Sequence, residues 1–443
     1  MINRGVNCFR INLSHGTQES KKSYFDLIKS SLDNNQESRP SILADLAGPK
    51  ARIRKLDKPI ILEKGQIIVI SSGEREEGVI PISKNLVFKN VEPNSKIMIN
   101  DGKICLKVIN QLSDYSFECE AASNGKIKNK KGVNFLGIEL DVPSLTTQDE
   151  IDLKLALENG ADWVALSFTR TKEDYSLVKS KMKAFGYDIP VIAKIEKWEA
   201  INNLDSIITT FDGVMVARGD LGVEIPLERV PVIQKEIISK ARLFGKPSII
   251  ATQMLDTMIK DPVPTRAEVS DIANSIIDGT DALLVTGETA VGDYPEEVIS
   301  VLSKVIEQTE QSISYNDKII NNDKVVSIAR AISYAASTMA KDLDLNTIVT
   351  MTQSGGTARM VSSYRPSASI YAMTTMIETY RVLSIIWGVI PVLVDNYNSS
   401  DEIPDLAKKK LQDMNVILSD EKFIITGGVP VNIPGTTNYI SVL

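Results

Sequence analysis

Polar residues that could do chemistry stand at the ends of several apolar runs in the middle of the chain. Lys194 and Glu196 end one run, Arg218 and Asp220 follow the next, and Thr252 ends a third. Asp45 and Glu288 hold the same place after two further runs. In barrels and doubly wound sheets, the carboxyl ends of parallel strands form the active site. We therefore expect these side chains to share one site.

The residue types suit chemistry on a phosphorylated acid. Two carboxylates, Glu196 and Asp220, match the ligands that Mg²⁺ takes from proteins. The ammonium of Lys194 would neutralise charge on a phosphoryl group or an enolate oxygen. Gly219 lets a ligand approach the backbone closely. The pattern predicts Mg²⁺-dependent chemistry and leaves the substrate open.

A second polar group lies near the amino terminus. It consists of Arg10, Asn12 and Ser14, followed by Gly16, with Arg52 as a further guanidinium suited to phosphate oxygens. The chain has one histidine, His15, which excludes a metal site built on several histidines and leaves His15 as the single candidate for a Ser-His-Asp triad. For any single residue, a polar loop following a strand is an equally good explanation, and the hypothesis depends on the whole set.

The elements that must position these residues alternate in type. Between 142 and 310, short apolar runs at 163–168, 191–195, 213–217, 248–252 and 282–286 alternate with amphipathic stretches. Thr147 and Glu150 have the spacing of a capping box, which predicts that a helix begins there. Repeated βα units favour a parallel α/β architecture, either a barrel or an open sheet.

Two other parts of the chain do not show this alternation of apolar runs and amphipathic stretches. Residues 50–133 contain only short strand-like runs separated by turn residues, which predicts an inserted all-β domain. After about residue 312, a helix over 325–341 leads into a second βαβ series, which predicts a doubly wound α/β domain. The expected domains are thus 1–49 with 134–312, 50–133, and 313–443.

Composition describes an ordinary globular protein of 443 residues with a net charge of −7. This acidic balance argues against nucleic-acid and anionic-membrane partners. Three cysteines without CxxC spacing indicate a reducing compartment, and no apolar run is long enough to span a bilayer, so we expect a cytoplasmic protein.

Several motifs, taken in order, closely resemble the pyruvate kinase family over essentially the whole chain. They are RINLSHG from Arg10, VIAKIE from Val191, VARGDLGVE from Val216, ATQML from Ala251, PTRAEVSD from Pro264 and GETA from Gly287. The resemblance implies a (β/α)₈ barrel with an inserted β lid and a C-terminal α/β domain. It also implies transfer of the phosphoryl group of phosphoenolpyruvate to ADP in glycolysis.

The resemblance also assigns roles to individual residues. Glu196 and Asp220 would hold Mg²⁺ or Mn²⁺, and Lys194 would stabilise the transferring phosphoryl group and the enolate. Arg10, Thr252 and the segment Ala217, Arg218, Gly219 and Asp220 would bind the substrate, with Arg10 and Thr252 also catalytic. Asn12, Ser14, His15, Arg52 and Lys131 would contact the nucleotide.

One departure from the family concerns a monovalent cation. Family members usually have Glu at the position of Lys50 and bind K⁺ at positions matching Asn12, Ser14, Asp45 and Leu46. Because an ammonium on a flexible stem can stand in for such an ion, we expect Lys50 to act as an internal cation. K⁺ would then not be required.

Three further expectations come from the resemblance. The family normally has a segment before the Arg10 motif with the first barrel strand, so we expect that strand to be missing. The loop containing Thr352, Ser354, Gly355 and Thr357 would bind a phosphorylated effector, although a plain polar helix cap explains it equally well. A homotetramer is the expected assembly.

Two rival functions remain at this point. An aldol lyase on a barrel would share the Lys, Glu and Asp chemistry, but would need neither ADP nor the β domain. A catalytically inactive, regulatory relative would be expected to lack a metal or phosphate ligand, and the sequence retains all of them.

Overall fold

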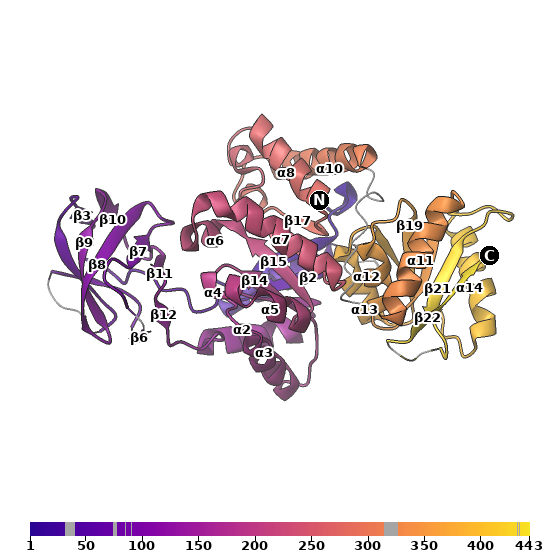
Figure 1. The fold of residues 1–443 in the computed structure, drawn as a ribbon, viewed down its shortest axis with the longest axis horizontal. Helices are drawn as coiled ribbons and strands as arrows, with labels where there is room; N and C mark the ends of the chain where they lie inside the picture. Colours follow the sequence, from indigo (N-terminus) through magenta and orange to yellow (C-terminus); the bar gives the residue numbers. More distant parts are fainter. Residues whose placement is uncertain are drawn as a thin grey trace.

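The computed structural model describes residues 1–31, 40–73, 78–84, 86–89, 91–313, 327–431, 433 and 435–443. Three bodies lie in a row in Figure 1, with a β domain at one end, a helix-wrapped sheet in the middle and an α/β domain at the other end. The segment 314–326, which follows the predicted start of the C-terminal domain at residue 313 and contains the predicted start of its first helix, lies outside the described residues.

The central sheet is parallel throughout and has the order β1-β2-β13-β14-β15-β16-β17 in the described part of the chain. Its strands are β1 Cys8–Asn12, β2 Ser41–Asp45, β13 Trp163–Leu166, β14 Val191–Ile195, β15 Gly213–Ala217, β16 Ser248–Ala251 and β17 Ala282–Leu284. Neighbours in this order are also successive in the chain apart from the inserted β domain, as repeated βα units require.

Helices cover the outer face of this sheet (Figure 1). The α-helices are α1 Gln18–Ser30, α2 Thr147–Glu158, α3 Glu173–Ala184, α4 Trp198–Asn202, α5 Leu204–Thr210, α6 Arg218–Glu224, α7 Val230–Leu243, α8 Arg266–Asp278, α9 Gly287–Ala290 and α10 Pro295–Ser312. Short 3₁₀ helices are η1 Ile2–Arg4, η3 Leu227–Arg229 and η4 Asp256–Ile259.

The predicted capping box of α2 was wrong by one residue. Thr146 is the N-cap, and its hydroxyl accepts a hydrogen bond from the backbone N–H of Asp149 at 3.1 Å. The carboxylate of Asp149 accepts from the backbone N–H of Thr146 in return, at 2.9 Å. It also accepts from the backbone N–H of Gly48 at 3.1 Å, and this tertiary contact favours the frame that begins at Thr146.

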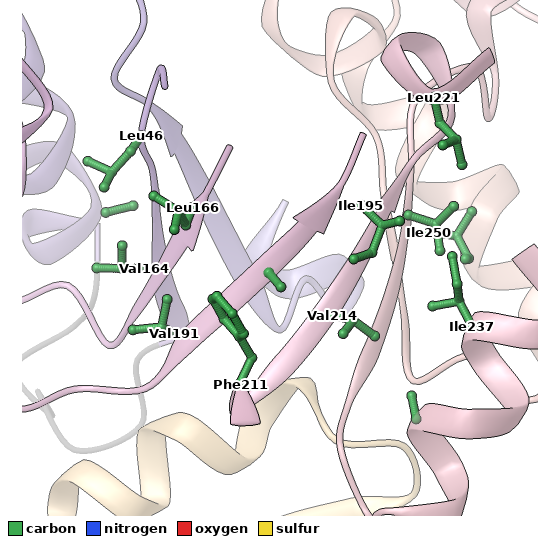
Figure 2. Close-up of a cluster of buried hydrophobic side chains, with 14 of the residues drawn as sticks. Leu46, Val164, Leu166, Val191, Ile195, Phe211, Val214, Leu221, Ile237 and Ile250 are labelled. Atoms are coloured by element: carbon green, nitrogen blue, oxygen red, sulfur yellow. The ribbon is translucent and has the colours of Figure 1, made fainter. Parts of the chain in front are cut away.

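Apolar side chains between the strands and the outer helices fix the position of the strands (Figure 2). Val191 and Ile195 of β14, together with Val214 of β15, are buried in this layer against helices that include Ile237. Each such side chain stabilises the fold by about 1.5–3 kcal/mol. Because side chains alternate along a strand, Lys194 faces the opposite side of β14, toward the interior of the curled sheet.

The C-terminal domain covers the amino-terminal end of the strands. Leu43, Trp163 and Met215 from the central sheet share one buried cluster with Leu383 and Ile385 of the C-terminal domain. This contact leaves the carboxyl ends of the strands for the site.

Strands are the regular secondary structure of the β domain in its described part. They are β3 Ile60–Leu62, β4 Ile67–Ser71, β5 Val79–Pro81, β6 Phe88–Lys89, β7 Lys96–Ile99, β8 Ile104–Ser113, β9 Ser116–Ala121, β10 Gly125–Ile127, β11 Val133–Leu136 and β12 Glu139–Leu140. Six of them form a sheet of order β11-β7-β8-β9-β4-β5, and β10-β3 and β12-β6 form pairs. An apolar cluster of its own fills this domain.

The C-terminal domain has a five-stranded sheet of order β20-β19-β18-β21-β22, antiparallel only at β22. Its strands are β18 Thr347–Met351, β19 Ser369–Thr374, β20 Val389–Leu393, β21 Ile424–Gly428 and β22 Thr437–Val442. Its helices are α11 Ile328–Asp342, α12 Gly356–Ser363, α13 Ile377–Val382 and α14 Ile403–Asp413, with η6 Leu383–Ile385 and η7 Ser400–Glu402.

Candidate active site

Lys194 is the centre of a buried polar cluster at the carboxyl ends of the strands. Its ammonium lies 3.0 Å from Glu196 Oε1 and 3.1 Å from Asp45 Oδ1, and it donates to Ser167 Oγ at 2.7 Å. The side chain of Lys194 is only 11% exposed. Three neighbouring strands, β2, β13 and β14, or the residues directly after them, therefore supply one charge cluster.

The opposite charges of Lys194 and Asp45 stabilise each other's ionised form. Burial alone would lower the pKa of Lys194, but the carboxylates of Asp45 and Glu196 outweigh it and raise that pKa above its ordinary value. Burial alone would raise the pKa of Asp45, but Lys194 and Arg10 outweigh it and lower that pKa. Lys194 is therefore a permanent cation and Asp45 a permanent anion at neutral pH.

Arg10 of β1 is held against the same carboxylate. Its Nε donates to Asp45 Oδ2 at 2.8 Å, and its terminal nitrogen lies 2.6 Å from that oxygen. The predicted neighbours Asn12, Ser14 and His15 follow on the same strand and its loop, and the last two are exposed. A planar guanidinium anchored on one edge by Asp45 can offer its remaining N–H groups to a phosphate.

Glu196 and Asp220 form the pair that could bind a divalent cation. Glu196 is 2% exposed, and its Oε2 accepts the backbone N–H of Phe168 at 2.8 Å. Burial raises the pKa of Glu196, and the nearby Asp220 carboxylate raises it further, although Lys194 opposes both. Two carboxylates that repel each other where water is scarce fit a cation between them. Among the described residues, no group of three or more His, Cys, Asp or Glu side chains could bind a metal, so substrate or water oxygens would complete the shell.

Lys50 also lies at the carboxyl ends of the barrel strands, the region called the barrel mouth below, and forms an ion pair with Asp220. Its ammonium also lies 5.7 Å from the centroid of the Phe168 ring. In the described structure, Lys50 thus contacts the predicted metal ligand Asp220, and the ion pairs of Asp45 are with Arg10 and Lys194. Leu46, predicted beside the monovalent cation, is fully buried, and its carbonyl accepts from Ser167 Oγ at 2.7 Å.

The segment from Ala217 to Asp220 begins helix α6 and is locked to the loop after β16. The backbone N–H of Gly219 donates to Thr252 Oγ1 at 2.9 Å. Arg218 donates to the carbonyl of Thr252 at 2.8 Å and to the carboxylate of Asp271 at 2.6 Å. Thr252 has a φ of 71°, a strained conformation that is characteristic of functional loops. The guanidinium of Arg218 therefore fixes the backbone of the site.

Arg52 and Lys131 lie where the chain passes between the two domains. The guanidinium of Arg52 donates to the carbonyl of Lys130 at 3.2 Å, and the carbonyl of Lys131 accepts from the backbone N–H of Ile53 at 2.8 Å. These two predicted nucleotide contacts thus belong to the β domain, whereas Asn12, Ser14 and His15 lie on β1 and the loop that follows it.

Ser167 and Phe168 are site residues that the sequence did not single out. Ser167 Oγ accepts from Lys194 and donates to the carbonyl of Leu46, and the Phe168 backbone binds Glu196. Ser167 directly follows β13, so the strand-end pattern that pointed to Asp220 could have found it. The contact of Phe168 is made by its backbone, which carries no sequence signal.

The predicted effector loop lies in the C-terminal domain, between β18 and α12. Thr352, Ser354 and Thr357 line a pocket of about 180 Å³ together with Gly428 and Thr436 from the end of the chain. Gly355 has a φ of +78°, so the loop needs glycine there to turn into α12. The hydroxyl of Thr357 lies 2.6 Å from that of Thr437, which joins the loop to β22.

A curled parallel sheet whose strand ends carry a buried lysine, paired carboxylates and an anchored guanidinium defines an enzyme of the (β/α)₈-barrel class. Family models match nearly the whole chain: the pyruvate kinase barrel domain matches residues 1–299, and the pyruvate kinase alpha/beta domain matches residues 330–443. The chain belongs to the pyruvate kinase family.

Individual relatives agree with this membership. A pyruvate kinase of Thermotoga maritima is 41% identical over 446 residues, which cover 100% of this chain and 95% of that protein. A pyruvate kinase of Staphylococcus aureus is 37% identical over 100% of this chain and 76% of that protein. A crystal structure of a pyruvate kinase from Cryptosporidium parvum superposes with a TM-score of 0.92 at 34% identity, over 100% of this chain and 91% of that chain.

The predicted family, the fold class with its barrel and C-terminal α/β domain, and the activity of a phosphotransferase are thereby confirmed. The chain is a pyruvate kinase in its activity, and the family uses a divalent metal. In the part of the chain that the structure describes, every helix is too short or too polar to cross a membrane.

Proposed function

We propose that the cluster around Lys194 is where the phosphoryl group of phosphoenolpyruvate passes to ADP, giving pyruvate and ATP. The observation that carries this proposal is the placement of the Lys194 ammonium, 3.0–3.1 Å from two carboxylates at the strand ends. A cation held this rigidly is preorganised to stabilise the charge that develops on the phosphoryl group and the enolate.

Glu196 and Asp220 would hold a divalent cation, Mg²⁺ or Mn²⁺. Bound there, the metal would supply Lewis-acid stabilisation of substrate oxygens. The chain itself supplies the rest of the substrate site. Arg10 would bind the phosphate, and the backbone from Ala217 to Asp220, locked by Thr252, would hold the carboxylate.

The nucleotide would lie between the barrel mouth and the β domain. Asn12, Ser14 and His15 would contact it from the barrel side, and Arg52 and Lys131 from the β domain. Since the two sets belong to different bodies, closure of the β domain as a lid would bring them together and exclude water, which would protect the phosphoryl group from hydrolysis. The lid would comprise the predicted residues 50–133 together with the rest of β11 and β12, to about residue 140.

K⁺ would not be required. In the family, the ion would be held at positions matching Asn12, Ser14, Asp45 and Leu46. Here the Lys50 ammonium already places a positive charge at the barrel mouth, and the Asp45 carboxylate is neutralised by Arg10 and Lys194. Both features reduce the attraction of this region for a further monovalent cation.

Three further properties extend the proposal. A phosphorylated effector would bind the hydroxyl-rich loop Thr352, Ser354, Gly355 and Thr357, because backbone N–H groups at the start of a helix attract anions. The active form would be a homotetramer in the cytoplasm, as expected for this family.

A coupled assay of pyruvate formation tests the reaction. Pyruvate should appear from phosphoenolpyruvate only when both ADP and a divalent cation are present, and Lys194→Met should reduce kcat by at least about 10²-fold. Pyruvate released at the same rate without ADP would instead indicate a lyase. Full activity of Lys194→Met would refute the assigned site.

A further inference from the structure

The β domain contacts the barrel through a buried carboxylate outside the residues assigned so far. Glu224 ends helix α6, and its side chain is 0% exposed. Its Oε1 accepts from Asn134 Nδ2 of strand β11 at 2.9 Å and from Lys197 Nζ at 2.9 Å. One oxygen therefore joins the β domain to two segments of the barrel.

Those two segments are the ones that carry the proposed metal ligands. Lys197 is the residue directly after Glu196, and Glu224 lies four residues after Asp220, on the same helix. Positions four apart lie on one face of a helix, so the lid contact and the Asp220 carboxylate share a face of α6. Helix α6 has only seven residues, which leaves little length over which a shift could be absorbed.

We infer that Glu224 is a positioning residue that sets the separation of the Glu196 and Asp220 carboxylates according to the position of the β domain. This inference rests on the metal assignment proposed above. When Asn134 is in place, Glu224 is hydrogen-bonded to the lid on one side and to Lys197 on the other, so both metal-binding segments are held. When the lid moves away, Glu224 loses one of these donors and α6 is less constrained.

The surroundings of Glu224 explain why the effect should be large. Asn134 is 6% exposed and Lys197 8%, so water cannot readily replace a lost donor. The second oxygen of Glu224, Oε2, is buried and has no hydrogen-bond partner in the described structure, so Oε1 makes both hydrogen bonds of this carboxylate there. The pocket between the domains that Asn134 and Lys197 help to line is small, with a volume of about 30 Å³, so the two sides are closely packed in this position of the lid.

The test measures metal binding directly: the Kd for Mn²⁺ is determined by electron paramagnetic resonance on the full-length enzyme without substrates. Asn134→Ala removes the lid contact and leaves the barrel sequence unchanged, and we expect it to raise the Kd for Mn²⁺ by about tenfold. Asn134→Asp places two carboxylates face to face and should weaken binding further.

A matched control removes a buried ion pair that joins helices α1 and α2 and makes no contact with Glu224, Glu196 or Asp220 in the described structure. Lys21 of α1 lies 2.7 Å from Asp152 of α2, and both are buried. Lys21→Met should lower the melting temperature while leaving the Kd for Mn²⁺ within about twofold of wild type. Steady-state kinetics should show the same split, with Asn134→Ala raising the Mg²⁺ concentration needed for half-maximal activity and Lys21→Met leaving it unchanged.

Two results would overturn the inference, and they are distinguishable. If Glu196→Gln abolishes Mn²⁺ binding but a folded Asn134→Ala binds Mn²⁺ like wild type, Glu224 does not position the site. If Glu196→Gln itself binds Mn²⁺ normally, the metal assignment is wrong and the inference fails with it.

Discussion

Replacing Glu196 by glutamine separates the stability of the site from its function. The substitution keeps the shape of the side chain and removes its negative charge. Oε1 lies 3.0 Å from the Lys194 ammonium, and Oε2 accepts the Phe168 N–H at 2.8 Å. Glutamine can preserve one of these contacts through its carbonyl oxygen, but the pair Glu196 and Asp220 can no longer bind a divalent cation with two carboxylates.

The metal-free protein should tolerate this change. The folded state raises the pKa of Glu196 above its ordinary 4.5, mainly through burial and then through Asp220. A carboxyl group with a raised pKa binds its proton more tightly when folded, so its contribution to stability falls as pH rises from 4.5 through the folded pKa. At neutral pH we therefore expect metal-free Glu196→Gln to be at least as stable as wild type.

Bound metal should make wild type more stable than Glu196→Gln. A ligand present at a hundred times its Kd stabilises the folded state by about 2.7 kcal/mol. Wild type should gain about this much from Mg²⁺, whereas Glu196→Gln should gain almost nothing. Since an electrostatic contribution to the transition state is lost as well, kcat/KM should fall by about 10²–10³-fold, or about 2.7–4 kcal/mol.

Thermal unfolding with and without Mg²⁺, at pH values on both sides of 4.5, checks both the stability of the metal-free protein and the stabilisation by metal. Lys21→Met serves as the control, because it should lower stability equally in the two conditions. The reasoning is refuted if metal-free Glu196→Gln is several kcal/mol less stable than wild type at neutral pH, or if it keeps the Mg²⁺-dependent rise in melting temperature.

Substitutions at Lys50, Thr252 and Gly48 test other parts of the structure. Wild type should be fully active in tetramethylammonium buffers, and Lys50→Glu should become K⁺-dependent; a wild-type K⁺ requirement in steady-state assays would contradict this. Thr252→Ala removes the acceptor for the Gly219 N–H and should lower kcat/KM about tenfold, whereas Thr252→Ser should retain activity; equal loss in both would show that the hydroxyl is not the reason. Gly48 has a φ of +67°, and a Cβ there would lie 2.9 Å from a neighbouring aromatic ring. Gly48→Ala should therefore destabilise by about 1–3 kcal/mol, more than Gly186→Ala, where φ is +83° and the space is open; equal melting temperatures would contradict the steric argument.

The sequence predicted the parts of the fold that repeat over short distances. The strands Val191–Ile195 and Gly213–Ala217 have the predicted bounds, because a buried parallel strand is a short apolar run that ends at its polar residues. The same pattern brought Lys194, Glu196 and Asp45 together correctly, since strand ends of one sheet meet at one edge.

Features decided by tertiary contacts could not be predicted. The segment Thr146–Glu150 contains two overlapping frames with capping-box spacing, and the hydrogen bond from Gly48 to Asp149 selects one of them. Asn134 and Glu224 are 90 residues apart and meet only because the β domain docks on α6. Neither contact leaves a local pattern in the sequence.

The charges at the barrel mouth show why metal and substrate should bind together. Asp45, Glu196 and Asp220 are three carboxylates, and they are matched by the three cations Arg10, Lys194 and Lys50. A divalent cation added alone would leave this poorly hydrated cluster with an excess of two positive charges, and an anionic substrate added alone would leave it negative. Because unbalanced charge is costly where water is scarce, each ligand should raise the affinity for the other. By linkage, the two should do so by the same factor.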